Sequence, residues 1–501
     1  MSQLRVRLPS ENNNMKKNLI CSSVVVVLVA AGCTMAPKYT RPAAPVPAEW
    51  PSGPAYIHAG ATNLPAIPDL KWQEFFPDQK LRQVIGLALT NNLDLRVAAL
   101  NVDRARAFYG IQRAEMLPTV EAKATGGKAR VPADLSSTGS RQTVDRYDAN
   151  LGVASWEIDF FGRIRSLSES ALEQYLATEQ ARRSAQILLV ASVANTYLAL
   201  AADRENLKLS ETTVESQQGS YNLIKRRFEL GLVPELDLHR AQSSLDVARR
   251  DVAVYRQLVA KDGNALNLLA GGPVPGELLP ADLAEVAQPI EISAGVSSEV
   301  LLRRPDVLQA ENLLKSANAD IGAARAAFFP RISLTAAMGT ASSDLSGLFK
   351  SGSSAWSYAP QIVMPIFDAR IWSAHKAAKV QRVIAVTQYE KAIQSAFRET
   401  ADALAVRGTV DEQLTAQESL VKAFSETHRL ASSRYDKGID SYLGVLDAQR
   451  SLFASQQLLV LLRLEKLASQ IQLYAVLGGG WHTGNEAEDA RFSASGTPNG
   501  K

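Results

Sequence analysis

An internal repeat constrains this chain more than any other feature of its sequence. Landmarks in the second half recur 207 residues after their counterparts in the first half, without a gap. Chance does not keep such a register, so the body of the chain consists of two copies of one structural unit of about 200 residues. The matching landmarks are Phe228, Gly231, Ala241, Gln242, Leu245 and Gly271 in the first copy, and Tyr435, Gly438, Ala448, Gln449, Leu452 and Gly478 in the second.

Each copy contains a predicted pair of strands. After Pro118 and after Pro330 polar and apolar residues alternate, which is typical of a strand with one wet face. Similar stretches follow beyond clusters of Gly, Ser and Asp, as in long hairpin loops. We predict strand hairpins at about 117–161 and about 330–367. One face is expected to carry Val120, Ala122, Ala124, Ile332, Leu334 and Ala336, and the other Thr119, Glu121, Lys123, Arg331, Ser333 and Thr335.

The second part of each copy has the pattern of two long helices. No proline interrupts the stretches 163–231 and 370–438, and about 68 residues at 1.5 Å each give a helix of roughly 100 Å. The returning segments carry apolar residues at spacings of three and four, which predicts a coiled-coil seam. Ser455 is a polar residue in the second seam. We therefore expect a helical hairpin in each copy, with turns near 231 and 438.

The N-terminus has the pattern of an export signal. Lys16 and Lys17 precede an apolar run of about 13 residues, which is too short to span a bilayer. The stretch from Leu28 to Cys33 resembles a lipobox, whose cysteine is acylated and becomes the first residue of the mature chain. The alternative is an ordinary signal peptide with a chance cysteine. Met15 would be a more ordinary start for such a signal than Met1.

These patterns predict the organisation of the whole chain. We expect a signal peptide at 1–32, a lipidated Cys33 with a proline-rich tether at 33–70, a first repeat at 71–270, a mid-height connector at 271–300, a second repeat at 301–480 and a C-terminal tail at 481–501. Apart from the covalent lipid on Cys33, no cofactor is expected.

Composition argues against several other functions. The net charge of +3 is spread along the chain, so nucleic acid is not an expected partner. Cys21 and Cys33 are the only cysteines, which leaves no thiol chemistry after residue 33. The five histidines lack metal-ligand spacing, and the glycine pairs lack the Lys-Ser/Thr of a phosphate-binding loop. We therefore expect neither an enzyme nor a metal site.

The predicted strands imply a channel. No segment after the leader has the 18 or more apolar residues of a spanning helix, so the strands are the remaining membrane element. An open sheet in lipid would leave backbone groups unpaired, so the sheet must close. Two copies of a four-stranded sheet would give eight strands, whose interior side chains fill, whereas three copies would give 12 and leave a passage. A homotrimer is therefore expected.

The chain resembles the outer-membrane factor family, the TolC-like efflux proteins, and especially its lipoprotein branch. The matching motifs include Trp156-Glu-x-Asp-x-Phe-Gly-Arg163, Arg304-Pro-Asp-Val307, Pro365-Ile-Phe-Asp368, Leu446-Asp-Ala-Gln-Arg450 and Leu477-Gly-Gly-Gly-Trp481. The resemblance implies a mixed α and β membrane protein, in which a trimeric 12-stranded β-barrel continues as a periplasmic α-helical coiled-coil barrel. It also implies outer-membrane sorting, a periplasmic membrane-fusion adaptor and an inner-membrane pump, most simply of the RND type, in drug efflux.

The two helical turns are the predicted gate. Gly231 and Gly438 suit helix C-caps, and Leu443 and Asp447 lie four apart on one helix face. Threefold repetition would make an apolar ring and an acidic ring, and the resemblance implies that both positions line the closed periplasmic aperture. Gly444 stands where other family members have a second acidic residue. Asp237 and Asp440 are further candidates for tip salt bridges; solvated cap carboxylates are the alternative.

Two other functions stay open at this point. The same architecture would also serve protein secretion, because cargo is chosen by the inner-membrane pump. A lipid-anchored periplasmic coiled-coil adaptor without a pore is the second alternative.

Overall fold

The protein is described by a computed structural model, which covers residues 34–56, 70–293 and 297–481. Cys33, the predicted leader and the predicted tail beyond Trp481 lie outside the described residues. The chain divides into two compact units, each assembled from separated stretches. The first unit contains Asp103–Leu176 and Glu311–Thr387 with the N-terminal residues up to Pro42, and the second contains Ala43–Val102, Ala177–Ala310 and Gln388–Lys501.

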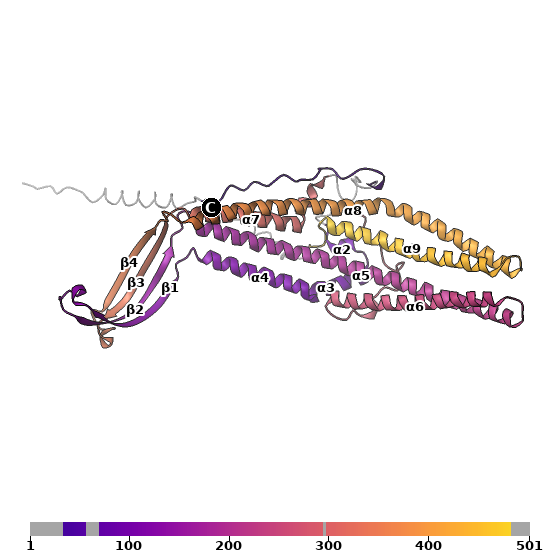
Figure 1. Cartoon of the computed structure of the whole chain (residues 1–501), viewed down its shortest axis with the longest axis horizontal. Helices are drawn as coiled ribbons and strands as arrows, with labels where there is room; N and C mark the ends of the chain where they lie inside the picture. The colour runs from indigo at the N-terminus through magenta and orange to yellow at the C-terminus, as the bar shows by residue number, and fades with distance from the viewer. Residues whose placement is uncertain (1–33, 57–69, 294–296, 482–501) are drawn as a thin grey trace, which may run out of the picture. The chain divides into compact units, whose positions relative to one another are not determined.

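The same order of elements occurs twice along the chain (Figure 1). A helix leads into a strand hairpin, which is followed by a long helix and a returning helix. The first set is α4 (Leu93–Ala114), β1 (Val120–Val131), β2 (Gln142–Glu157), α5 (Arg163–Glu229) and α6 (Glu235–Ala270). The second is α7 (Pro305–Ala326), β3 (Arg331–Ser342), β4 (Ser354–Val363), α8 (Ala369–Asp436) and α9 (Tyr442–Val476). The short helices α2 (Trp72–Phe75) and α3 (Gln79–Asn91) precede the first set.

The four strands of the first unit form one antiparallel sheet in the order β1-β2-β3-β4 (Figure 1). Cross-strand partners share a face, and the register aligns Leu151 with both Ala122 and Met338, and Met338 with Trp356. The alternation therefore places the six predicted apolar residues on one face and five of the six predicted polar residues on the other, whereas Thr119 precedes β1. One β-bulge between Val153 and Trp156, where Ser155 has a φ of 51°, keeps Trp156 on the apolar face opposite Leu334.

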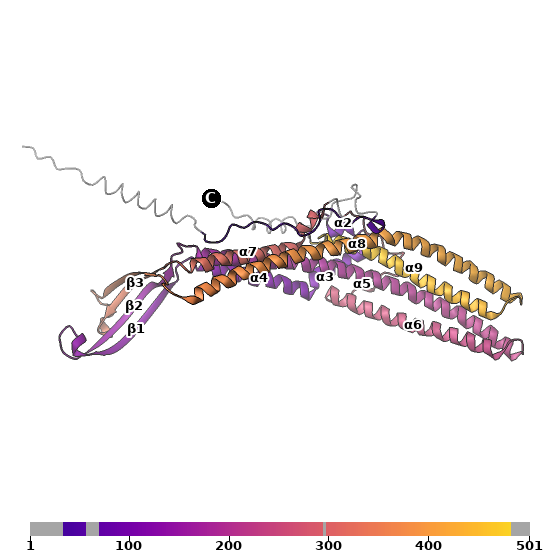
Figure 2. The same ribbon diagram turned by 45° about the horizontal axis from the view of Figure 1, so that its top comes forward.

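In the second unit the helices pack through the predicted seams. Ala241, Leu245, Ala248 and Val252 of α6 are buried. Ser455 is buried in the seam of α9 without a polar cost, because its hydroxyl donates to the carbonyl of Leu452 and its carbonyl accepts from Gln417 Nε2. The hairpin of α5 and α6 lies beside that of α8 and α9 near the turns in both views (Figure 2).

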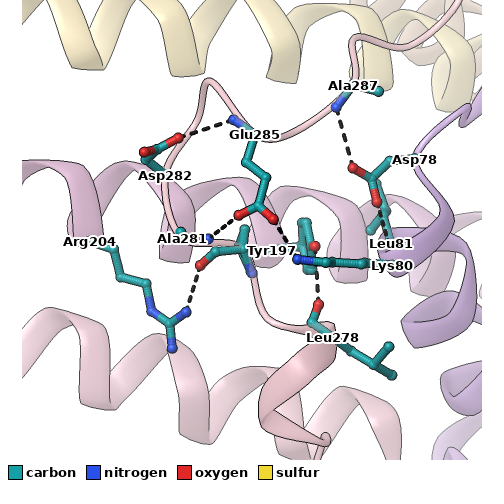
Figure 3. Close-up of polar contacts among 11 residues, drawn as sticks. Asp78, Lys80, Leu81, Tyr197, Arg204, Leu278, Ala281, Asp282, Glu285 and Ala287 are labelled. Atoms are coloured by element: carbon teal, nitrogen blue, oxygen red, sulfur yellow. Dashed lines mark hydrogen bonds and ion pairs between the residues drawn. The ribbon is translucent and has the colours of Figure 1, made fainter.

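The connector between the two repeats is fixed by polar contacts to α3 and α5 (Figure 3). The carboxylate of Glu285 accepts from the backbone N–H of Ala281 and pairs with Lys80 at 2.5 Å. Tyr197 Oη donates to the carbonyl of Leu278 at 3.1 Å, and Arg204 Nη1 donates to that of Pro280 at 2.6 Å. Lys80 comes from α3, and Tyr197 and Arg204 come from α5, so these helices hold the proline-rich connector in place.

One prediction about membrane-spanning segments is wrong. Helix α5 contains an 18-residue window with a mean hydropathy of 1.6, which is long and apolar enough by composition to cross a membrane. However, 61% of that window is buried within the fold, as in the core helix of a packed bundle. The apolar run therefore has a packing partner in the protein, and it is weak support for a spanning helix.

Candidate functional site

The two helical turns are built in the same way. After α5, the backbone N–H of Leu232 donates to the carbonyl of Arg227 at 2.9 Å, and that of Gly231 donates to Phe228 at 2.8 Å. After α8, Ile439 donates to Arg434 at 3.0 Å and Gly438 to Tyr435 at 2.9 Å. These are the two bonds of a Schellman motif, which needs a left-handed residue after the helix. Gly231 and Gly438 supply it, with φ values of 70° and 69°.

A small apolar core joins the two hairpins behind these turns. Its buried members are Ile224 of α5, Ala241 of α6 and Tyr442, Val445 and Leu446 of α9. Tyr435 of α8 packs against this cluster, with its ring 5.2 Å from that of Tyr442. The guanidinium of Arg227 lies 5.1 Å from the centre of the Tyr435 ring, which is within cation–π range. The ends of the hairpins are thus held to each other by apolar packing and by this contact.

The second turn is also closed by an ion pair. Arg434 donates to both carboxylate oxygens of Asp440, and this hydrogen-bonded guanidinium holds the pKa of Asp440 below its ordinary value. In the first turn, Asp237 pairs with Arg240 of its own helix at 3.5 Å. The two predicted tip carboxylates therefore differ, because Asp440 links the end of α8 to the turn whereas Asp237 pairs within α6.

Leu443 and Asp447 lie on the face of α9 opposite the apolar core. Tyr442, Val445 and Leu446 are buried, whereas the side chain of Asp447 is 62% exposed. Its nearest cation is Arg450 on the same helix, at 3.9 Å. Leu443 is 39% exposed, so both predicted aperture residues form a stripe that this protomer leaves uncovered. In the register of the repeat their counterparts are Leu236 and Arg240, so an acidic residue occurs here in the second copy alone.

The sequence reasoning missed two of these contacts. The helix dipole alone favours basic residues in a last turn, whereas the structure gives Arg227 and Arg434 each a side-chain partner. A signal for Arg434 was present, because a Schellman turn brings a residue in the last helical turn close to one just beyond it. No such local signal exists for Arg227, whose partner Tyr435 lies on another hairpin.

An antiparallel sheet with one apolar face, together with two long helical hairpins that share one buried cluster near their turns, defines a component of a membrane channel. Comparison with known proteins gives the same class. The family model described as outer membrane efflux protein matches the chain twice, over residues 84–272 and 296–479. The chain belongs to the outer membrane efflux protein family, and it is an outer-membrane protein of that class.

Individual relatives support the same assignment over nearly the whole chain. The toluene efflux pump outer membrane protein TtgC of Pseudomonas putida is 47% identical over 489 residues, covering 97% of this chain and 100% of the relative. Outer membrane protein OprJ of Pseudomonas aeruginosa is 40% identical over 92% of this chain and 96% of its own length. The solved open state of the Neisseria gonorrhoeae MtrE outer membrane channel superposes with a TM-score of 0.80 at 36% identity, covering 90% of this chain and 99% of MtrE.

Proposed function

We propose that the chain is the outer-membrane exit duct of a tripartite efflux system, and that three copies close a 12-stranded barrel. The observation that carries this proposal is the sheet, whose order leaves β1 and β4 with open edges. In lipid each unpaired peptide group costs several kcal/mol, so the edges of one copy must pair with those of others. Three copies give the smallest closed arrangement that leaves a passage.

The helices beside the two sheet edges support the same assembly. In the first unit, α4 leads into β1 and exposes Phe108 and Ile111, at 60% and 64%. Helix α8 follows β4 and exposes Trp372, Val380 and Val383. Apolar stripes of this kind mark an interaction surface. Because they lie on the elements next to the open edges, one neighbouring copy on each side would cover the edge and the stripe together.

Lipid and partner proteins complete the proposal. Cys33 carries the lipid that anchors the chain in the outer membrane, and the helical part extends into the periplasm. A periplasmic membrane-fusion adaptor contacts the turns and links them to an inner-membrane pump of the RND type. The relatives named as toluene and antibiotic efflux components favour small organic molecules as cargo over secreted proteins. The pore-free adaptor is disfavoured by the family assignment.

Leu443 and Asp447 would narrow the periplasmic end of this duct. Their exposed stripe on α9 has no covering side chain in one protomer, which fits residues that face an axis of symmetry. Three leucines and three aspartates would then form an apolar ring and an acidic ring that slows ion leakage. Arg434 and Asp440 would hold the second turn in the shape that places this stripe.

The assembly is tested with the purified full-length protein in detergent. Light scattering should give a mass of three chains, and planar bilayers should show channel conductance. Phe108→Asp places a charge in the proposed contact between copies, and it should give monomers without conductance. Ser136→Asp, in the exposed loop between β1 and β2, is the matched control and should stay trimeric. A monomeric wild-type protein, or a trimer that never conducts, contradicts the proposal.

A further inference from the structure

The residues that follow Cys33 lie along α7 in the first unit. The carbonyl of Met35 accepts from Arg325 Nη1 at 3.1 Å, and that of Pro37 accepts from Asn318 Nδ2 at 2.7 Å. Arg41, further along, reaches Glu311. The residue numbers of the contacts thus decrease along α7 as they increase along the segment, so the two run antiparallel. We call residues 34–42 the N-terminal strap. They contain no helix or strand, and the contacts to α7 order them instead.

Glu311 is the centre of this contact. Its side chain is only 4% exposed, and a buried carboxylate is costly unless it is paired. Arg41 Nη2 lies 2.5 Å from Oε2, while Arg41 Nε and Tyr39 Oη each donate to Oε1 at 3.1 Å. Burial raises the pKa of Glu311, but Arg41, Lys315 and Tyr39 together bring it below its ordinary value. Two of these three partners come from the strap, so α7 holds a buried charge that the strap neutralises.

The surface of α7 also leaves room for the backbone of the strap. A Cβ added at Gly322 would lie 2.7 Å from the backbone nitrogen of Ala36 and 2.9 Å from its Cα. Any larger residue there would push the strap away, so the main chain of the strap is in direct contact with the surface of α7. A hydrogen-bond donor of α7 lies on each side of this contact, at Asn318 and at Arg325.

We propose that α7 carries a docking site for the first residues of the mature chain, and that this site holds the point of lipid attachment beside the end of α7 that leads into β3. The lipid itself rests on the function proposed above. A free segment of nine residues reaches about 30 Å, whereas in the docked strap the chain before Met35 starts from a position that the contact with Arg325 fixes. The lipid is then held close to the strands that enter the same membrane.

Limited digestion with trypsin tests both the docking of the strap and the lipid on Cys33. Lys38 is exposed, but the Lys38–Tyr39 bond is cut only when the strap backbone can enter the protease, so the folded trimer should be cut slowly there. Glu311→Ala removes the acceptor for Tyr39 and Arg41 and should speed this cleavage about tenfold or more, since charged hydrogen bonds are the strong ones. Mass spectrometry of the released peptide, Cys33 to Lys38, shows whether Cys33 is acylated.

Two further variants separate the possible outcomes. Glu169→Ala removes an exposed carboxylate from α5 in the same unit and should leave the cleavage rate unchanged. Tyr39→Phe combined with Arg41→Ala alters the strap alone and should also speed cleavage, which covers the case that Glu311→Ala does not fold. Rapid cleavage in the wild-type protein, or equal rates in all variants, overturns the docking site. An unmodified Cys33 in a protected strap refutes the lipid and leaves the docking site standing.

Discussion

The guanidinium of Arg434 binds the carboxylate of Asp440 through two hydrogen bonds, from Nε to Oδ2 at 2.5 Å and from Nη2 to Oδ1 at 3.2 Å. The pair connects the last turn of α8 to Asp440, two residues before α9 begins at Tyr442. It therefore fixes the direction in which α9 leaves the turn, and with it the position of the stripe that carries Leu443 and Asp447.

Breaking this pair should loosen the turn. Arg434→Ala is expected to raise the single-channel conductance of the purified protein in planar bilayers, because the acidic stripe is then less firmly held. The lowered pKa of Asp440 means that the pair is fully present at neutral pH and is lost only as the pH falls below the ordinary range of carboxyl groups. Arg429→Ala removes another exposed ion pair of α8, with Glu426, and should leave conductance unchanged.

The acidic stripe itself gives the second prediction. Asp447→Ala removes the proposed ring of negative charge at the periplasmic end. The variant should show a higher single-channel conductance in planar bilayers and a weaker preference for cations. Asp246→Ala, an exposed carboxylate of α6, is the matched control. Equal conductance for Asp447→Ala and the wild-type protein would contradict the aperture.

Two glycines close to each other on the chain give opposite predictions. Gly438 has a φ of 69°, so Gly438→Ala should destabilise the turn by about 1 kcal/mol or more. Gly444 lies inside α9 with nothing within 4 Å of an added Cβ, so Gly444→Ala should stabilise the helix by roughly 0.5–1 kcal/mol. Thermal unfolding followed by circular dichroism distinguishes the two. The same sign of change for both would refute the left-handed turn.

The features that the sequence predicts best are those set by neighbours along the chain. The alternation of polar and apolar residues predicted both faces of the sheet, and a glycine at the end of each long helix predicted the turns. Ser155 at the bulge was not foreseen, because only the register against Leu334 requires an extra residue there. The strap was expected to be an unpacked tether, and its contact between Arg41 and Glu311 joins residues 270 positions apart. A local pattern carries no information about such a pair.

A carboxyl pair between α5 and α6 lies between these two cases, because the turn that joins the helices sets which of their residues face each other. Ile224 and Ala241 meet in the core next to the turn, and Asp203 and Asp262 each lie 21 residues further from it. The turn therefore sets a register that places the two aspartates opposite each other. Burial, the hydrogen bond that protonated Asp203 donates to Asp262 and the charge of Asp262 together raise the pKa of Asp203 to about 7.

This pair should make the stability of the protein depend on pH. A carboxyl group with a raised pKa holds its proton in the folded state, so stability is greatest at acidic pH and falls as the pH rises from about 4 towards 7. Asp203→Asn supplies a neutral donor to Asp262 at every pH. At pH 8 the variant should unfold at a higher temperature than the wild-type protein. Its free energy of unfolding should be larger by roughly 1 kcal/mol, once solvent screening is taken into account. At pH 4 the two proteins should unfold alike. Asp246→Asn, which changes an exposed carboxylate of α6, should leave the unfolding temperature unchanged at both pH values. If the stability of Asp203→Asn falls between pH 4 and pH 8 as much as that of the wild-type protein does, the two aspartates do not share a proton.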